Sequence, residues 1–490
     1  MEPQATTGSF KLPFAWAHIF LAFAVGLMLS FLVFIDPLVF SHLDFYYGTI
    51  NISTVIPFEF AILFLVCLLL LSCLSYFFSR NFTNNLLLFL LVLTPFVTVI
   101  SENIIEIGFI VLVIAFLVVF ARSCLEGRTE FRASPTFLFI IGLAVFWLNS
   151  LMAPCLGVGE KIKGLLTVAL HVCSRLGFFS FIVLFVNDFN QVRRFLDYMF
   201  IFGLISGVIG LFQLAYFFIT GSEITFSTGV FVWLETPFGL LPRSTALMIS
   251  PNELGVVTAI STVILLGYLL WEKDLGVKRK CMYWLCIIIL LVSQGPPLSR
   301  SALMALAVVV CLISFLYKPS KGIHVLLLYL LIAIAATLVG LTSYMVENFL
   351  ELNTSSADFR IYTSQIAFRA IRHFPLTGIG LGNFSDYNNV FNLIVHNTFL
   401  QPAADFGLLG ALIFWCFLFF IVIRIGLLAI PAPTPPHGCT YRILFLVCLI
   451  YLVAAPFQPF MFLKHLWLVL AVTEASILLN RETEKDYLND

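Results

Sequence analysis

Charged residues are scarce in this chain of 490 residues. Only 11% of the residues are Asp, Glu, Lys or Arg, whereas 61% are hydrophobic. A soluble globular chain has about 25% charged residues and roughly half apolar ones. The polar sequence is too short to cover a water-facing surface, which excludes a soluble enzyme, a nucleic-acid-binding protein, a disordered chain and a secreted disulfide scaffold. The chain is therefore expected to use lipid as its solvent.

Several motifs are also missing. The sequence has no C-x-x-C pair, and eight of its 11 cysteines lie within apolar runs, so we expect neither a disulfide nor a metal site. It has no D-x-D pair that would suit a metal-dependent transferase. Its apolar runs are continuous, whereas the strands of a membrane barrel alternate over about ten residues. These observations together predict an all-α, polytopic membrane protein.

Long apolar runs give the number of expected spans, since a spanning helix needs roughly 20 apolar residues and about 17 at the least. Fourteen runs qualify or come close, but the third and fourth are short and could form a re-entrant hairpin, which leaves 12–14 spans. The runs lie near 14–35, 56–78, 86–100, 104–120, 136–152, 166–186, 196–220, 246–270, 281–297, 302–317, 323–344, 408–429, 443–456 and 462–480.

The basic residues indicate an orientation, because Lys and Arg concentrate in cytoplasmic loops. With the N-terminus inside, 17 basic residues face the cytoplasm and 8 face outward, so both termini are predicted to be cytoplasmic. We divide the chain into N-terminal membrane helices (1–195), a central membrane region (196–430) that includes a large outer loop (346–407), and C-terminal helices with a short cytoplasmic tail (431–490).

Five arginines are unusual because they cluster in three loops on the predicted outer side, which tends to lack basic residues: Arg243, Arg300, Arg360, Arg369 and Arg372. Arg243 precedes a span that opens with Asn252 and Glu253, and Arg300 begins another span. Arg360 lies in the large outer loop. Because polar groups at membrane depth are costly without partners, Asn252 and Glu253 predict a lined cavity.

Arg175 lies inside a predicted span, where a central arginine costs roughly 2.5–3.5 kcal/mol on insertion scales. His171 precedes it by one helical turn, so both face one side of that helix. An internal ion pair that holds helices together and a contact with substrate explain this arginine equally well.

The large outer loop carries two further polar motifs. The stretch 359–374 predicts an amphipathic helix that Pro375 ends, and the Gly-rich turn after it permits close backbone approach. His396, Asn397 and Asp405 then lie at the start of a long apolar run. A histidine with a near-neutral pKa there suits proton acceptance from a sugar hydroxyl.

Arginines and a histidine at an outer membrane surface suggest a phosphorylated lipid substrate. The guanidinium is a planar fork that matches phosphate oxygens and keeps its charge. A diphosphate on a polyprenyl tail would lie at this depth, and its departure as a leaving group needs its charge neutralised.

Four elements of the sequence, in order over about 240–415, resemble one known family. They are R…SPNELG (243–255), SRSAL (299–303), FR…FPLTGIGLGNF (359–384) and HNTFLQPAADFGLLG (396–410), the last similar to the pattern H-N-x-x-L…E-x-G-x-x-G. The chain thus resembles the bacterial O-antigen ligase and O-antigen polymerase superfamily of integral membrane glycosyltransferases. It departs from that pattern at Asp405, where the family usually has Glu.

The resemblance implies an all-α fold of the glycosyltransferase C type in the bacterial cytoplasmic (inner) membrane. It implies inverting transfer of glycan from an undecaprenyl-diphosphate carrier on the extracytoplasmic face, without a cofactor or metal. His396 would be the base or the group that orients the acceptor, with Arg243 and Arg300 holding the diphosphate. Further candidates for substrate contact are Arg360, Asn397, Asn252, Glu253, Asp405 and Arg175.

The acceptor and the class of protein stay open at this point. A polymerase would use a second glycan as acceptor, and a ligase would use lipid A–core. We slightly favour the polymerase. Polysaccharide assembly proteins are further candidate partners. A branch that glycosylates proteins ranks third because its usual soluble appendage is not seen. The alternative class is a lipid-linked oligosaccharide flippase or polysaccharide transporter, for which matching broken helices in two halves would be expected.

Overall fold

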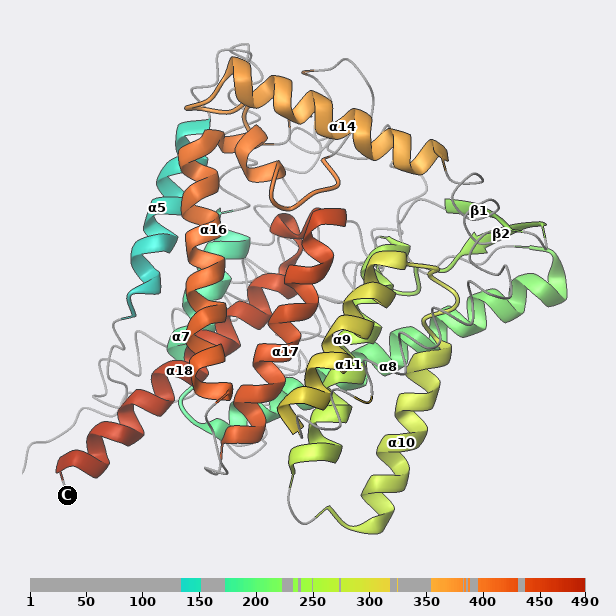
Figure 1. The fold of residues 1–490 in the computed structure, drawn as a ribbon, viewed down its shortest axis with the longest axis vertical. Helices are drawn as coiled ribbons and strands as arrows, with labels where there is room; N and C mark the ends of the chain where they lie inside the picture. Colours follow the sequence, from blue (N-terminus) through green and yellow to red (C-terminus); the bar gives the residue numbers. More distant parts are fainter. Residues whose placement is uncertain are drawn as a thin grey trace, which may run out of the picture.

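The computed structural model describes residues 134–150, 172–222, 232–236, 239–248, 250–272, 275–317, 324, 354–381, 383–384, 387, 395–430 and 437–489. Most of this part of the chain is helical (Figure 1). In chain order the elements are α5 (Thr136–Asn149), the π-helix η4 (Val172–Gly177), α7 (Phe178–Phe185), α8 (Phe189–Thr220), β1 (Val232–Thr236), β2 (Gly239–Arg243), α9 (Pro251–Trp271), α10 (Val277–Val292), α11 (Arg300–Tyr317), α14 (Thr354–His373), α16 (Gln401–Ala429), α17 (Gly438–Ala454), the 3-10 turns η7 (Ala455–Phe457) and η8 (Phe460–Phe462), and α18 (Lys464–Asn489).

Five described helices are long and apolar enough to cross a membrane. They are α8, α9, α11, α16 and the continuous stretch Gly438–Phe457 formed by α17 and η7. The protein is therefore a helical membrane protein, as its composition predicts. The predicted spans at 14–35, 56–78, 86–100, 104–120 and 323–344 lie outside the described residues, and so does the choice between a hairpin and two spans.

Helix α8 shows why the ends of predicted spans differ from the observed helix ends. The apolar run begins at 196, yet the helix begins at Phe189 because Asp188 caps it, accepting a hydrogen bond from the backbone N–H of Gln191 at 2.8 Å. Arg193 and Arg194 therefore belong to the helix, although charge ended the apolar run. Helices continue into the polar boundary of a membrane wherever a side chain caps them.

A two-stranded antiparallel hairpin is a correction to the all-α prediction. Strands β1 and β2 pair with Val232 opposite Arg243 and Thr236 opposite Gly239. The segment lies between two candidate spans, where its backbone groups need partners that no helix provides. The hairpin determines where β2 ends, and Arg243 is the last residue of that strand.

Helix α9 is the most buried of the candidate spans, and its hydroxyl groups are satisfied within the helix. Thr258 donates to the carbonyl of Leu254 at 2.9 Å, Ser261 to that of Val257 at 3.0 Å, and Thr262 to that of Thr258 at 2.8 Å. In lipid or a dry core such bonds remove the cost of burying a hydroxyl.

An ion pair joins α16 to α18 inside the protein. Arg424 Nη1 lies 2.7 Å and 2.8 Å from the two carboxylate oxygens of Glu474, and Ser134 donates a hydrogen bond to the same carboxylate. The Glu474 side chain is fully buried.

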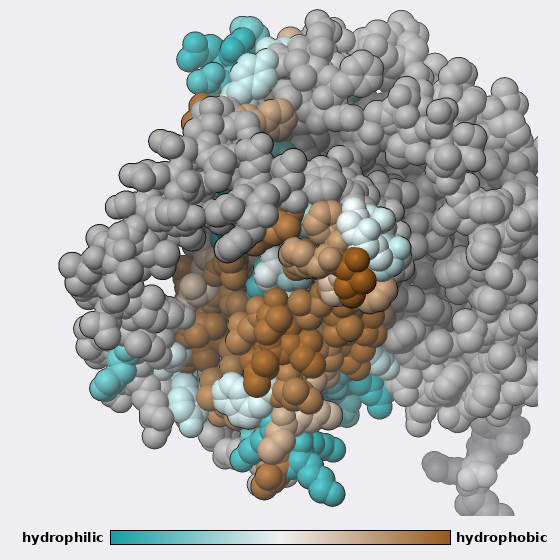
Figure 2. Space-filling view, turned by 90° about the vertical axis from the view of Figure 1, so that its right-hand side faces the viewer, coloured by the Kyte–Doolittle hydropathy of each residue, from teal (hydrophilic) through white to brown (hydrophobic). Residues whose placement is uncertain are grey.

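A broad apolar surface and helix α14 lie on different parts of the molecule (Figures 1 and 2). Figure 1 shows α14 lying across one end of the helices, close to where α16 begins. Figure 2 faces the side that carries α10 and shows a broad apolar surface with hydrophilic residues at its lower edge. The exposed apolar side chains on α10 include Met282, Leu285 and Ile288, which are about half exposed.

Helices α8 and α9 approach closely because α8 has glycine at its contact positions. A Cβ atom at Gly203 would lie 1.8 Å from Ser261 Oγ on α9, and one at Gly207 would lie 3.4 Å from Thr258 Cγ2 on α9 and 2.6 Å from Ser293 Oγ, just after α10. Small residues four apart are the usual means by which membrane helices pack closely.

We expect Gly203→Leu to destabilise the protein by about 1–3 kcal/mol, the usual cost of overpacking a core. Thermal unfolding of the purified protein in detergent measures this change. Gly276→Ala is the matched control, because a Cβ there meets nothing within 4 Å. Equal melting temperatures for Gly203→Leu and the unmodified protein would contradict the close contact between α8 and α9.

Candidate active site

Four of the predicted site residues come together from four separate elements. Arg243 ends β2, Arg300 begins α11, Arg360 lies in α14, and His396 precedes α16. Their charges act on one another: Arg360 and Arg300 lower the pKa of Arg243, Arg300 lowers that of Arg360, and Arg360 lowers that of His396. The four side chains therefore lie within electrostatic reach across more than 150 residues of sequence.

Arg243 is held in place by three acceptors. Its Nε donates to the carbonyl of Pro297 at 2.8 Å, and its Nη2 donates to Asn252 Oδ1 at 2.8 Å and, more weakly, to the carbonyl of Leu298 at 3.5 Å. Burial, and then the like charges of Arg360 and Arg300, lower the pKa of Arg243 to about 10. The guanidinium still carries its charge at neutral pH.

The loop before α11 is strained at the point where it contacts Arg243. Leu298 has a φ of 46°, a left-handed conformation that a residue with a branched side chain adopts rarely. Such strain persists only where surrounding contacts impose it, and it is concentrated at functional sites. Asn252 is a positioning residue for a separate reason: its carboxamide oxygen accepts a hydrogen bond from Arg243 Nη2 and so orients that guanidinium.

His396 is half-buried, and its ring centroid lies 6.0 Å from that of Phe359 on α14. Burial first, and the positive charge of Arg360 second, lower the pKa of His396 to about 4. The near-neutral pKa expected from the sequence is therefore wrong. At neutral pH the imidazole carries no charge and has a lone pair with which to accept a proton.

Asn397 shapes the backbone beside His396. Its Oδ1 accepts hydrogen bonds from the backbone N–H groups of Phe399 at 2.8 Å and Leu400 at 3.1 Å, so the side chain caps the turn that leads into α16. This local bond is a common structural use of asparagine. Asn397 is a predicted candidate for substrate contact, and in the structure its side-chain oxygen accepts the two hydrogen bonds of this turn.

Thr398 and Gln458 connect this turn to the end of α17. The Thr398 backbone N–H donates to the carbonyl of Ala455 at 2.9 Å, and its hydroxyl donates to the carbonyl of Gln458. Gln458 Nε2 donates in turn to Ser301 Oγ at 2.7 Å in the first turn of α11. Gln458 links the histidine turn to the helix that begins at Arg300. It lies in the polar P-F-Q-P stretch between two apolar runs, a signal that the sequence analysis did not use.

The Gly-rich turn packs directly against the first turns of α16. Gly378, Gly380 and Gly407 have φ values of 65°, 90° and 79°, and α16 is kinked at Gly407. A Cβ on Gly378 would lie 2.4 Å from the Asp405 backbone, and one on Gly407 would lie 2.5 Å from that of Leu376.

Backbone hydrogen bonds join the two segments. The N–H groups of Ile379 and Gly380 donate to the carbonyls of Ala404 and Asp405 at 2.9 and 3.1 Å. The glycines thus allow two backbones to meet, as predicted. The N–H groups of Ile379 and Gly380 are used in this contact.

Among the described residues, the Asp405 side chain makes no hydrogen bond to the arginine cluster. Its side chain is 2% exposed, and its Oδ2 has no hydrogen-bond partner in the part of the chain that the structure describes. The structure gives no bond between this carboxylate and His396. Asp405 therefore contributes its backbone to the Gly-rich contact, while its role toward substrate stays a prediction.

A buried chain of three polar side chains lies next to Asn252, and sequence reasoning found only one of them. Glu253 Oε1 lies 3.0 Å from His465 Nε2, and His465 Nδ1 lies 2.6 Å from the Tyr451 hydroxyl. The side chains of Glu253 and His465 are 3% and 0% exposed. The Tyr451 hydroxyl hydrogen-bonds Nδ1, whereas Nε2 is in close contact with the carboxylate without the geometry of a hydrogen bond. His465 begins the last apolar run, where its polarity is the available signal.

Arg175 contacts the backbone that precedes α18. Its Nε and Nη2 donate to the carbonyl of Phe462 at 3.2 and 3.0 Å, and the residue is 5% exposed. This bond ties η4 to η8, a helix-holding role of the kind weighed against substrate binding. His171, one turn earlier, lies outside the described residues.

We predict that His465→Ala destabilises the protein more than Glu253→Gln. Removing the imidazole leaves a buried carboxylate without its partner, which costs roughly 3–5 kcal/mol, whereas glutamine removes the buried charge and keeps a side-chain oxygen beside the imidazole. Thermal unfolding in detergent compares the two variants. A Glu253→Gln protein as unstable as His465→Ala would contradict this prediction and show that the contact depends on the carboxylate charge.

Comparison with known families supports the motifs. Residues 281–415 match the family described as O-antigen ligase. This range contains Arg300, Arg360, His396 and Asp405, while Arg243 precedes it. A comparison with curated proteins finds no match. Residues 281–415, which carry three of the four clustered side chains, are thus similar to the O-antigen ligase family.

Proposed function

We propose that the protein is an extracytoplasmic glycosyltransferase that moves glycan from an undecaprenyl-diphosphate carrier to an acceptor in surface polysaccharide biosynthesis. The observation that carries the proposal is the convergence of three guanidinium groups, those of Arg243, Arg300 and Arg360. Among the described residues, no carboxylate contributes to the pKa shifts of Arg243, Arg360 or His396. Positive charges held together at such a cost favour an anionic substrate.

A diphosphate leaving group matches this arrangement chemically. As the anomeric carbon–oxygen bond breaks, negative charge grows on the diphosphate, and preorganised guanidinium groups stabilise it without reorganising. Arg300 adds the positive end of the α11 dipole, since it is the first residue of that helix. Arg243 is fixed by backbone carbonyls and by Asn252, so its position is set before substrate arrives.

His396 supplies the base. The acceptor hydroxyl attacks the anomeric carbon from the face opposite the diphosphate, its proton passes to the neutral imidazole, and the diphosphate departs with the bonding electron pair. This single displacement inverts the configuration. The lowered pKa of about 4 keeps the imidazole in its accepting form at neutral pH.

The lipid tail of the donor accounts for the position of the site. The cluster lies where α9 and α11 begin, at the ends of two candidate spans, so that a polyprenyl chain would extend along the apolar helices. The distribution of basic residues supports the proposal that this end faces the extracytoplasmic side.

The acceptor distinguishes a polymerase from a ligase. We keep the polymerase as the slightly favoured candidate, with a growing glycan as acceptor, and lipid A–core as the acceptor of the ligase. Reconstituted protein with undecaprenyl-diphosphate glycan, with and without lipid A–core, separates them. A ladder without lipid A–core supports the polymerase, and a product only in its presence supports the ligase. Glycan that crosses the bilayer unchanged would refute both and support a flippase.

Replacing one clustered arginine should lower transfer strongly. We expect Arg360→Gln to reduce kcat about 10²–10³-fold, as removal of one transition-state donor does. Arg369→Gln is the control, since it lies on the same helix and is exposed. Single-turnover transfer rates in proteoliposomes measure both variants. Equal losses in the two variants would contradict a specific role for Arg360.

Replacing the proposed base should abolish most of the transfer. We expect His396→Gln to lower kcat by about 10²–10⁴-fold, the usual contribution of a general base. Binding of the lipid-linked donor, measured by equilibrium ultrafiltration in detergent, should change little, because the arginines that hold the diphosphate remain. Transfer at the unmodified rate would show that His396 is not the base.

The pH profile tests the electrostatics of the cluster. A histidine whose folded-state pKa is lowered is deprotonated above that pKa, so activity should be lost only as the pH falls toward about 4. Arg360→Gln removes a repelling charge and should move this acid limb of kcat/KM to higher pH, while Arg369→Gln should leave it unmoved. An acid limb near 6.5, the ordinary histidine value, in the unmodified protein would contradict the buried environment of His396.

A further inference from the structure

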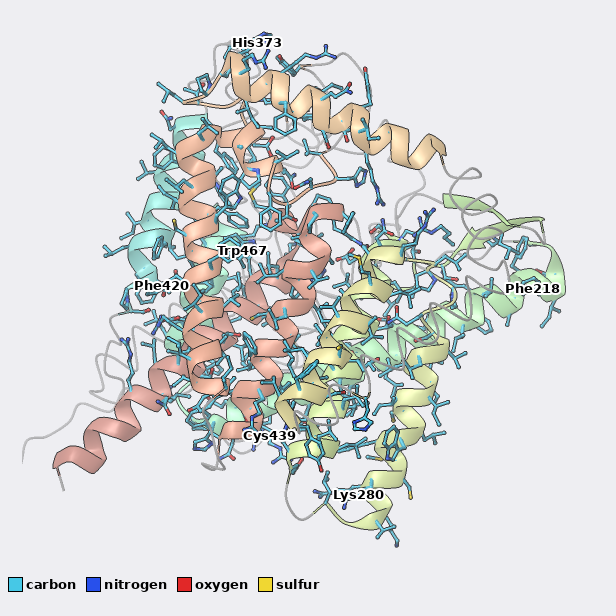
Figure 3. The ribbon with its side chains drawn as sticks, viewed as in Figure 1. Phe218, Lys280, His373, Phe420, Cys439 and Trp467 are labelled. Carbon is cyan, nitrogen blue, oxygen red and sulfur yellow. The ribbon has the colours of Figure 1, made fainter. Side chains whose placement is uncertain are left out.

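A second polar hollow lies at the opposite end of α9 from the arginine cluster. It has a volume of about 510 Å³. Helix α9 begins at Pro251, beside Asn252, and ends at Trp271, just before Glu272 of the hollow. At 1.5 Å per residue its length is about 30 Å, the thickness of a bilayer core. Figure 3 shows Lys280 on α10 and His373, the last residue of α14, at opposite ends of the molecule. The lining residues are Arg193, Asp197, Phe200, Ile201, Glu272, Arg279, Met282 and Tyr283.

Most charged groups of the hollow hold one another in place. Arg193 Nη2 donates to Glu272 Oε1, and its guanidinium carbon lies 5.5 Å from the centre of the Tyr268 ring. The Tyr268 hydroxyl donates to Asp197 Oδ1 at 2.9 Å. One side of the hollow is thus a preorganised network that joins α8 to the end of α9.

Two groups of opposite charge are left over by this network. Glu272 Oε2 is buried and has no hydrogen-bond partner in the described part of the chain. Arg279 is exposed, and the structure shows no hydrogen bond or ion pair for it among the same residues. The lining contains two arginines and two carboxylates, so it offers no net charge to a ligand. It offers one acceptor for a cationic N–H and one donor for an anion.

The other side of the hollow is apolar and opens toward lipid. Ile201 and Met282 are 36% and 50% exposed, and Phe200 lies beside them in the lining. From there, exposed apolar side chains continue along both helices, Ile205 on α8 and Leu285 on α10. A ligand with a zwitterionic head and a long apolar body fits this combination.

We propose that the hollow binds the headgroup of a zwitterionic aminophospholipid, of the phosphatidylethanolamine type, from the leaflet opposite the candidate active site. The ammonium group donates to the Glu272 carboxylate, whose side chain is 17% exposed, and the phosphate accepts from Arg279. The acyl chains lie along the apolar faces of α8 and α10. The volume lies within the range of about 300–1,000 Å³ common for small-ligand sites. This site is independent of the proposed transfer reaction.

The chemistry distinguishes this lipid from its two common competitors. Phosphatidylcholine has the same charges, but its quaternary ammonium has no N–H and cannot hydrogen-bond Glu272. Phosphatidylglycerol has no cation, so it leaves Glu272 Oε2 unpaired and brings its negative charge next to Asp197 and Glu272. Preference for an N–H-bearing zwitterion is therefore the signature of this site.

Native mass spectrometry of the delipidated full-length protein, titrated with each of the three lipids, tests the proposal. We expect phosphatidylethanolamine to bind about tenfold more tightly than the other two, the effect of one charge-assisted hydrogen bond. Glu272→Gln and Arg279→Gln should each remove most of this preference. Lys280→Gln is the matched control, because Lys280 is exposed on α10 next to Arg279 but does not line the hollow.

The variants keep the test independent of folding. Glu272→Gln retains an oxygen that accepts from Arg193, and Arg279→Gln changes an exposed side chain that the network does not use. Equal binding of phosphatidylcholine, tighter binding of phosphatidylglycerol, binding of no lipid, or an unchanged preference in both variants would each overturn the proposal.

Discussion

The mutual repulsion of three guanidinium groups is the interaction on which the candidate site depends. Arg243, Arg300 and Arg360 are brought into electrostatic reach although burial and like charge oppose it. The favourable packing of the helices must offset that cost, because nothing in their own charges draws the three residues together. Because the cluster holds like positive charges together, it favours a ligand with several negative charges. Burial, and then the positive charge of Arg360, keep His396 neutral.

Backbone contacts supply most of the rigidity around this cluster. Arg243 is held by carbonyls of the strained loop before α11, and the histidine turn is bonded to the end of α17. The Gly-rich turn and the start of α16 meet backbone to backbone through residues with positive φ. Carbonyl and amide groups are short and fixed, so they position an arginine or a turn with less loss of entropy than long side chains would. Glycine at these positions therefore acts on the site without touching a substrate.

The two ends of α9 differ in their electrostatic character. One end gathers positive charge near Asn252, and the other ends in a hollow where arginines and carboxylates balance. Between them the hydroxyl groups of the helix bond to its own carbonyls, which makes α9 a dry and buried connection. The positively charged end suits the anionic lipid substrate proposed above, and the charge-balanced end suits the zwitterionic lipid proposed above.

The sequence alone determined that the protein is helical and suited to a membrane, and it predicted the residues of the candidate site. Scarce charge and long apolar runs require a helical membrane protein, and outer arginines with His396 are informative because their residue types are costly in those places. Glycine spacing predicted a close backbone approach, since only glycine permits it. These conclusions follow from local composition, which needs no knowledge of what each residue touches.

Tertiary structure decided what depends on partners distant in sequence. The low pKa of His396 and the chain from Glu253 to Tyr451 arise from segments far apart in the sequence. Gln458 and His465 are polar residues beside or within apolar runs, but the sequence alone does not show which residues they contact. Burial and charge–charge interaction are properties of three-dimensional neighbours. The sequence could therefore name Arg243, Arg300, Arg360 and His396, but only the fold could place them together and set their electrostatics.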